Sequence, residues 1–160
     1  MKKIILAMVA VMVPLMLSAG STDFWFRHFS VEDGLSSSAV RAIMQDKYGF
    51  MWLGTDDGLN RYDGTTIKIY RLNPEGVNDY ISFLYDTTDR IWIGTGDGVY
   101  IYDYETENFE PFKLLTAKGD SIKTNVNHIA EDRDGNLWFS TVGQGIFKYN
   151  VSKRYLERYD

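Results

Sequence analysis

The same sequence pattern occurs three times in this chain, and this repeat limits the folds that the chain can adopt. Residues 50–64 hold an apolar, β-prone run, a tight turn at Asp56-Asp57-Gly58 and a second, alternating run. Asp-Gly is a strong hairpin signal, because this turn needs a backbone with positive φ. Residues 90–103 and 136–150 repeat the pattern. Each copy therefore predicts two antiparallel strands.

The same residue types mark each copy at fixed places. They are the tryptophans Trp52, Trp92 and Trp138 and the turn glycines Gly58, Gly98 and Gly145. The tryptophans are 40 and 46 residues apart, and the glycines 40 and 47, so the third turn has one extra residue. A period of about 40–50 residues with several short strands indicates a β-propeller, one blade per repeat. The fixed place of the tryptophans favours a core role over a ligand-stacking role.

We predict an all-β fold, a partial β-propeller of about three four-stranded antiparallel blades in an open arc. Residues 40–79 form blade 1, residues 80–125 blade 2 and residues 126–160 blade 3. Inner strands are expected at residues 40–45, 80–85 and 126–131. Each is closed by an aspartate that can accept backbone N–H groups and fix the next turn. These are Asp46, Asp86 and Asp132.

The outer strands share an apolar–x–x–aromatic form. They are expected at residues 67–70, 109–112 and 156–159. The same form occurs at residues 26–29, with no inner strands before it. Residues 22–39 are therefore predicted to be a latch strand and a connector, with one orphan N-terminal outer strand from a last blade. The alternative is a disordered lead-in at residues 23–29.

The first 21 residues are typical of a secretory signal peptide. Lys2 and Lys3 precede an apolar run, and small residues follow it, which predicts cleavage near Gly20 or Ser21. The alternative is an uncleaved anchor, although the run is shorter than the roughly 20 residues of a spanning helix. We expect an exported protein. It has no cysteine, so disulfides and thiolate metal sites are excluded.

No group of residues forms a recognisable catalytic site. Asp56 and Asp57 are adjacent, so their side chains point apart and make a poor acid pair. The run that starts at Asp132 resembles a calcium loop, but its glycine is misplaced. We therefore expect no enzyme activity, no metal and no cofactor. The formal net charge of −5 gives no reason to expect contact with nucleic acid.

At the level of whole motifs, the chain closely resembles the two-component regulator propellers. The resemblance is carried by residues 29–40, which include Glu-Asp-Gly-Leu-Ser, and by the Trp-x-Gly-Thr-x-x-Gly-Leu-x-Arg-Tyr-Asp-Gly run of residues 52–64. It extends over everything after the leader. Asp89 and Ser140 replace the usual glycines of the second and third repeats.

This resemblance implies the N-terminal part of a periplasmic sensor. Such proteins belong to hybrid two-component systems, common in gut Bacteroidetes, which sense oligosaccharides from glycans and regulate polysaccharide-utilisation genes. Their kinase and DNA-binding parts have no counterpart in these 160 residues. The implied partners are an oligosaccharide and the remainder of the receptor chain, on the periplasmic side of the inner membrane. A homodimer is a further expectation, because open ends expose strand faces.

Two other functions stay open, an exported propeller enzyme acting on glycans (a lyase or hydrolase) and a secreted interaction module. The ligand candidates are turn and connector residues expected on one face, which is also the place for ordinary turn residues. These candidates are Asp57, Asn78, Asp97, Asn127 and Gln144.

Overall fold

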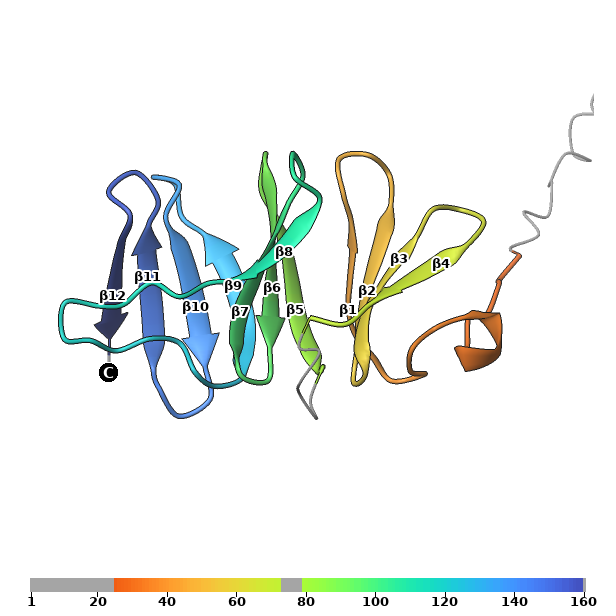
Figure 1. The fold of residues 1–160 in the computed structure, drawn as a ribbon, viewed down its shortest axis with the longest axis horizontal. Helices are drawn as coiled ribbons and strands as arrows, with labels where there is room; N and C mark the ends of the chain where they lie inside the picture. Colours follow the sequence, from red (N-terminus) through yellow and green to blue (C-terminus); the bar gives the residue numbers. More distant parts are fainter. Residues whose placement is uncertain (1–24, 73–78, 160) are drawn as a thin grey trace, which may run out of the picture.

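The computed structural model describes residues 25–72 and 79–159. The predicted signal peptide and Asn78 lie outside them. The described residues form three four-stranded antiparallel sheets that stand side by side (Figure 1). The strands of blade 1 are β1 (Val40–Gln45), β2 (Met51–Thr55), β3 (Gly58–Tyr62) and β4 (Ile67–Tyr70). Those of blade 2 are β5 (Ile81–Asp86), β6 (Arg90–Thr95), β7 (Gly98–Asp103) and β8 (Asn108–Pro111). Those of blade 3 are β9 (Val126–Glu131), β10 (Leu137–Thr141), β11 (Ile146–Asn150) and β12 (Tyr155–Tyr159). The predicted all-β, three-bladed fold is confirmed.

Each inner strand carries an irregularity at the same place. The pairing of β1 with β2 shifts between Val40 and Ala42, and β5 and β9 shift at the equivalent positions. A bulge leaves one residue unpaired and re-aims its side chain. The bulge residues are Arg41, Ser82 and Asn127.

The core lies between neighbouring blades, where the repeated tryptophans pack. Trp52 is fully buried, and its ring centroid is 5.1 Å from that of Tyr102 in blade 2. Trp92 is 3% exposed and packs in the same way against Tyr149 of blade 3, at 5.8 Å. Trp52 and Trp92 thus each form a contact between one blade and the next.

A glycine lets the inner strand of the following blade come close. A Cβ on Gly54 would lie 2.6 Å from Cγ2 of Ile81, and one on Gly94 would lie 3.1 Å from the carbonyl oxygen of Val126. Ser140 holds the equivalent place in blade 3. The close contacts between blades 1 and 2 and between blades 2 and 3 therefore require a glycine at this position. We call these contacts joints.

Two of the three predicted turn aspartates bind their tryptophan. The Asp46 carboxylate accepts bonds from the backbone N–H groups of Tyr48 and Phe50 and, at 2.7 Å, from Nε1 of Trp52. Asp132 likewise accepts from Nε1 of Trp138 at 2.9 Å. A carboxylate thus closes the turn and orients the indole.

The prediction for Asp86 is wrong. Thr87 takes the turn position, and its N–H bonds the carbonyl of Arg90 at 2.8 Å. Asp86 lies one residue earlier, paired with Ile91 at the end of β5, and accepts the Tyr104 hydroxyl at 2.9 Å. The cause is a turn one residue shorter than in blades 1 and 3, which the spacing to Trp92 does not reveal.

The predicted orphan strand at residues 26–29 does not form. Residues 25–30 have no regular secondary structure, and Trp25 and Phe26 are each 93% exposed. The reason is that a strand needs a hydrogen-bonded neighbour. Residues Val31–Asp33 form a 3-10 turn with Ser30 as its N-cap. No helix among the described residues is long and apolar enough to span a membrane.

Candidate functional site

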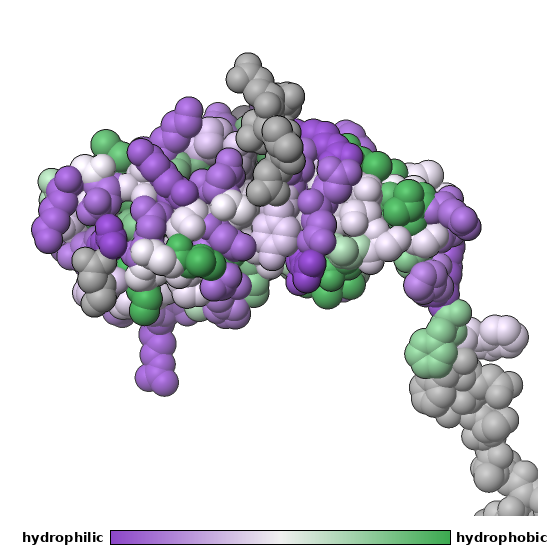
Figure 2. Space-filling model, turned by 90° about the horizontal axis from the view of Figure 1, so that it is seen from below, coloured by the Kyte–Doolittle hydropathy of each residue, from purple (hydrophilic) through white to green (hydrophobic). Residues whose placement is uncertain are grey.

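The predicted ligand residues were expected where connectors meet the turns between second and third strands. The turns between second and third strands lie at the lower edge of Figure 1, where the inner strands also begin, and Figure 2 shows that hydrophilic residues cover much of this face. One hydrogen bond repeats there in every blade. The turn residues Asp56, Gly96 and Val142 donate their N–H groups to the carbonyls of Ala39, Tyr80 and Asn125. We call this the connector face.

Asp57 lies on this face and is engaged by Arg71. Nη2 of Arg71 donates to Oδ2 of Asp57 at 2.9 Å, and Nη1 also contacts the carboxylate. The two side chains are 44% and 58% exposed, and ion pairs this accessible contribute about 0–1 kcal/mol to stability. Asp57 therefore remains open to solvent.

Asp97 occupies the same turn position in blade 2 and borders a cavity. It accepts the Thr95 hydroxyl at 2.8 Å. The cavity, about 360 Å³, lies between the β6–β7 turn, the end of β8 and the connector of residues 113–125. Its polar side chains come from Asp97, Tyr100, Lys113, Ser121 and Lys123. Burial, followed by the charges of Asp97 and Asp79, raises the pKa of Tyr100, so this hydroxyl keeps its proton.

Gln144 belongs to blade 3 but shapes the same cavity. Its side-chain oxygen accepts the N–H of Lys123 at 2.9 Å, and its amide nitrogen donates to the carbonyl of Ser121 at 3.2 Å. Both bonded residues line the cavity. Gln144 is therefore a positioning residue for the connector, a role that its glycine-rich turn did not suggest.

The structure thus brings two of the described candidates to one cavity and leaves Asp57 and Asn127 apart from it. Asp97 and Gln144 meet at the connector of residues 113–125, whereas Asp57 lies in the turn of blade 1. Asn127 is exposed at the bulge of β9, the place that Arg41 and Ser82 hold on the other inner strands. Arg41 pairs there with Asp56, Nε to Oδ1, at 2.7 Å.

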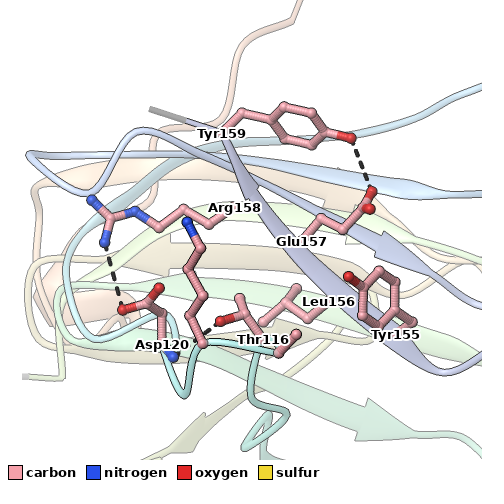
Figure 3. Close-up of a pocket in the computed structure, with 9 residues that line it drawn as sticks. Thr116, Asp120, Tyr155, Leu156, Glu157, Arg158 and Tyr159 are labelled. Carbon is pink, nitrogen blue, oxygen red and sulfur yellow. Dashed lines mark hydrogen bonds and ion pairs between the residues drawn. The ribbon is translucent and has the colours of Figure 1, made fainter.

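Sequence reasoning missed a second hollow, of about 230 Å³, on the outer side of blade 3. Figure 3 shows that the connector reaches β12, where Thr116 pairs in parallel with Leu156. Arg158 approaches Asp120 at 3.7 Å, and the Tyr159 hydroxyl donates to Glu157 at 2.9 Å. Two of its charged groups, Asp120 and Arg158, already pair with each other, so it is the weaker candidate. The only available signal was the length of this connector.

Chemically, the cavity of the connector face is suited to binding. Two ammonium groups, one carboxylate and two hydroxyls border an apolar floor that includes Val99 and Phe112. Pockets that orient polar ligands combine such a floor with a few placed polar groups. No group of three or more metal-ligating side chains occurs within residues 25–72 and 79–159.

Comparison with known proteins relates two segments of these blades to a family of repeats. The family model of the two component regulator propeller matches residues 34–57 and 121–143. The matched segments are similar to blades of a two-component regulator propeller. This propeller is 56% identical over 59 residues to histidine kinase P4 of Formosa agariphila, which is 37% of the chain but 4% of that kinase.

Solved structures agree. The propeller superposes on the extracellular domain of the hybrid two component system BT3049 of B. thetaiotaomicron with a TM-score of 0.74 and 29% identity, covering 84% of this chain and 20% of that domain. The domain of BT4673 of B. thetaiotaomicron, at 24% identity, 84% and 20% coverage and a TM-score of 0.64, shows the shared fold. The propeller therefore spans a small part of these relatives.

A virginiamycin B lyase from Staphylococcus aureus has the same fold at 15% identity and a TM-score of 0.60, over 76% of this chain and 41% of the lyase. This likeness carries no argument about activity. The extracellular domains of BT3049 and BT4673, which have higher identity, come from hybrid two component systems.

Proposed function

We propose that this propeller is the N-terminal part of the extracytoplasmic sensor of a hybrid two-component system. It detects glycan-derived oligosaccharides and thereby regulates polysaccharide-utilisation genes. The observation that carries the proposal is the match to two-component regulator blades, together with the likeness to an extracellular domain of such a system. The signal peptide expected at residues 1–21 would export it to the periplasmic side of the inner membrane.

The cavity beside Asp97 supports an oligosaccharide as the ligand. Saccharide hydroxyls both donate and accept hydrogen bonds, so they can pair with the Asp97 carboxylate and with the Lys113 and Lys123 ammonium groups. These bonds to charged partners are the stronger kind. The remainder of the receptor chain would carry the signal onward.

The test is a reporter assay in cells that carry the whole receptor gene. Asp97→Asn is expected to weaken the response to the activating oligosaccharide by roughly ten- to a hundredfold in half-maximal concentration, since one hydrogen bond to a charged group contributes about 1.5–3 kcal/mol. Asp57→Asn is the matched control, because Asp57 holds the same turn position in blade 1.

Either of two results would overturn the proposed sensor function. One is a receptor that no glycan fraction activates. The other is an ectodomain that turns over a glycan, which would select the exported enzyme instead. An equal loss in both aspartate variants would leave the sensor function and remove only the assignment of the cavity.

A further inference from the structure

A groove opens between blades 1 and 2 on the edge opposite the connector face. It lies between the β1–β2 turn and the β7–β8 turn and holds about 310 Å³. Four of its lining side chains are aromatic, Tyr48, Phe50, Tyr102 and Tyr104. Arg61 and Glu107 bring opposite charges to it. We call it the joint groove.

The next joint shows which of these residues the fold requires. There a smaller groove of about 210 Å³ is bordered by equivalent positions of blades 2 and 3. Tyr149 occupies the position equivalent to Tyr102. The positions equivalent to Phe50 and Tyr104 are occupied by Arg90 and Val151, which are not aromatic. Arg61 itself is replaced by Ile101 in blade 2. The aromatic walls and the arginine are thus particular to one joint, and a blade forms without them.

Aromatic contacts hold the Arg61 guanidinium in place and leave its hydrogen-bond donors unused within the described residues. Its guanidinium carbon lies 4.5 Å from the ring centroid of Phe50 and 5.7 Å from that of Trp52. Among residues 25–72 and 79–159, no hydrogen bond or ion pair to this guanidinium is present. Arginine stacks on aromatic faces and offers a planar fork of donors that matches a carboxylate. Because the stacking fixes the fork in advance, less entropy is lost on binding.

The other charges of the groove favour an anion over a cation. The Asp46 carboxylate is already satisfied by three N–H groups. Nζ of Lys47 lies 4.3 Å from the ring centroid of Tyr104, so the protein's own ammonium fills the cation–π position. Glu107 is exposed and opposes an anion. The unused guanidinium is therefore the strongest recognition group.

We propose that the joint groove binds a ring that bears a carboxylate, with the carboxylate on Arg61 and one face of the ring against Tyr48. Tyr48 meets Tyr104 edge-on at 5.3 Å and has Nζ of Lys47 at 5.1 Å from its ring centroid, yet the residue is 63% exposed, which leaves ring surface for a ligand. Two sources share this chemistry, a uronate unit of an acidic oligosaccharide and a free aromatic acid. We assign the uronate, and that choice of source rests on the proposed glycan-sensing function.

Calorimetric titration of the 160-residue chain tests the site, with digalacturonate, neutral galactobiose and benzoate as probes. Digalacturonate is expected to bind at least tenfold more tightly than galactobiose. Arg61→Gln should weaken its binding at least tenfold, and Glu107→Gln should strengthen it by about threefold through loss of a like charge. Lys148→Gln, at the position of Arg61 in blade 3, should change nothing.

Glu107→Gln keeps the test decisive if Arg61→Gln fails to fold, because Glu107 lies at the exposed surface. Binding of benzoate alone would retain the carboxylate site and overturn the uronate. Equal affinities for digalacturonate and galactobiose, no binding of either acid, or indifference to both groove variants would overturn the site. None of these results decides the reporter response of the whole receptor, so the two proposals fail separately.

Discussion

The three repeated tryptophans hold one position in sequence but differ in surroundings, and this predicts unequal costs of removal. Trp92 is 3% exposed, and its ring lies 5.4 Å from Phe112 and 5.9 Å from Phe139, centroid to centroid. Trp92→Ala should lower the free energy of unfolding by about 3–5 kcal/mol, the usual cost of truncating a buried Trp. For a chain of this size that corresponds to a fall of roughly 6–20 °C in melting temperature.

Trp138 is the matched control. Its indole N–H is bonded to Asp132 and its ring stacks on Tyr159 at 5.7 Å, but no described blade covers its outer side. Trp138→Ala should therefore cost about 1–2 kcal/mol, one hydrogen bond and part of the apolar burial. Trp25 is 93% exposed, and its removal should change stability by less than about 0.5 kcal/mol.

Urea unfolding followed by far-ultraviolet circular dichroism measures all three variants without relying on tryptophan fluorescence. The midpoint should fall in the order Trp92, Trp138, Trp25, with the slope of the transition unchanged. Equal losses for Trp92→Ala and Trp138→Ala would refute the reasoning, because the contribution of the indole would then not depend on the blade packed beside it.

Two further predictions concern the joints and the turns. Gly54→Ala should lower stability by about 1–3 kcal/mol, because its Cβ would lie 2.6 Å from Cγ2 of Ile81; an unchanged thermal melt would contradict so close an approach of the blades. The bonds that Asp132 accepts from Trp138 and Asn136 hold the pKa of its carboxyl below the ordinary value. Ionised Asp132 therefore stabilises the fold fully above the unfolded-state pKa of about 4. This stabilisation is lost as the pH falls through the lower folded-state pKa. Urea midpoints from pH 6 to pH 2.5 should decline less in Asp132→Asn than in the parent, and parallel curves would argue against this.

The sequence was informative where one repeat predicts its neighbour. The turn glycines Gly58, Gly98 and Gly145 all have positive φ, as the tight hairpin turns predicted there require. The inner strand expected at residues 80–85 was one residue out, because a turn can lose a residue while its aspartate keeps the same distance from the tryptophan. The pairing Asp86↔Ile91 and the bond from the Thr87 N–H to the Arg90 carbonyl show the shift.

The candidate site was less accessible to sequence reasoning. Turn chemistry singles out Asp57 and Asp97 alike and gives no sign that Asp97 borders a cavity. That cavity arises because the connector of residues 113–125 runs from blade 2 to the outer edge of blade 3, where Thr116 pairs with Leu156. Such a contact between distant segments leaves no periodic signal. Arg61 was not among the candidates because it lies inside the motif of residues 52–64 and looks like an ordinary residue of the repeat.

The N-terminal segment shows how a wrong prediction can retain a correct contact. Residues 25–30 form no strand, but the Phe29 ring packs edge-on against Tyr62 at 5.0 Å and 61°. Phe112, the last residue of the apolar–x–x–aromatic form in blade 2, meets Tyr149 of blade 3 at 5.1 Å and 65°. Phe29 therefore contacts blade 1 as an outer-strand aromatic of a preceding blade would. The side-chain contact between two blades can thus form even where the segment that carries it has no neighbouring strand to pair with.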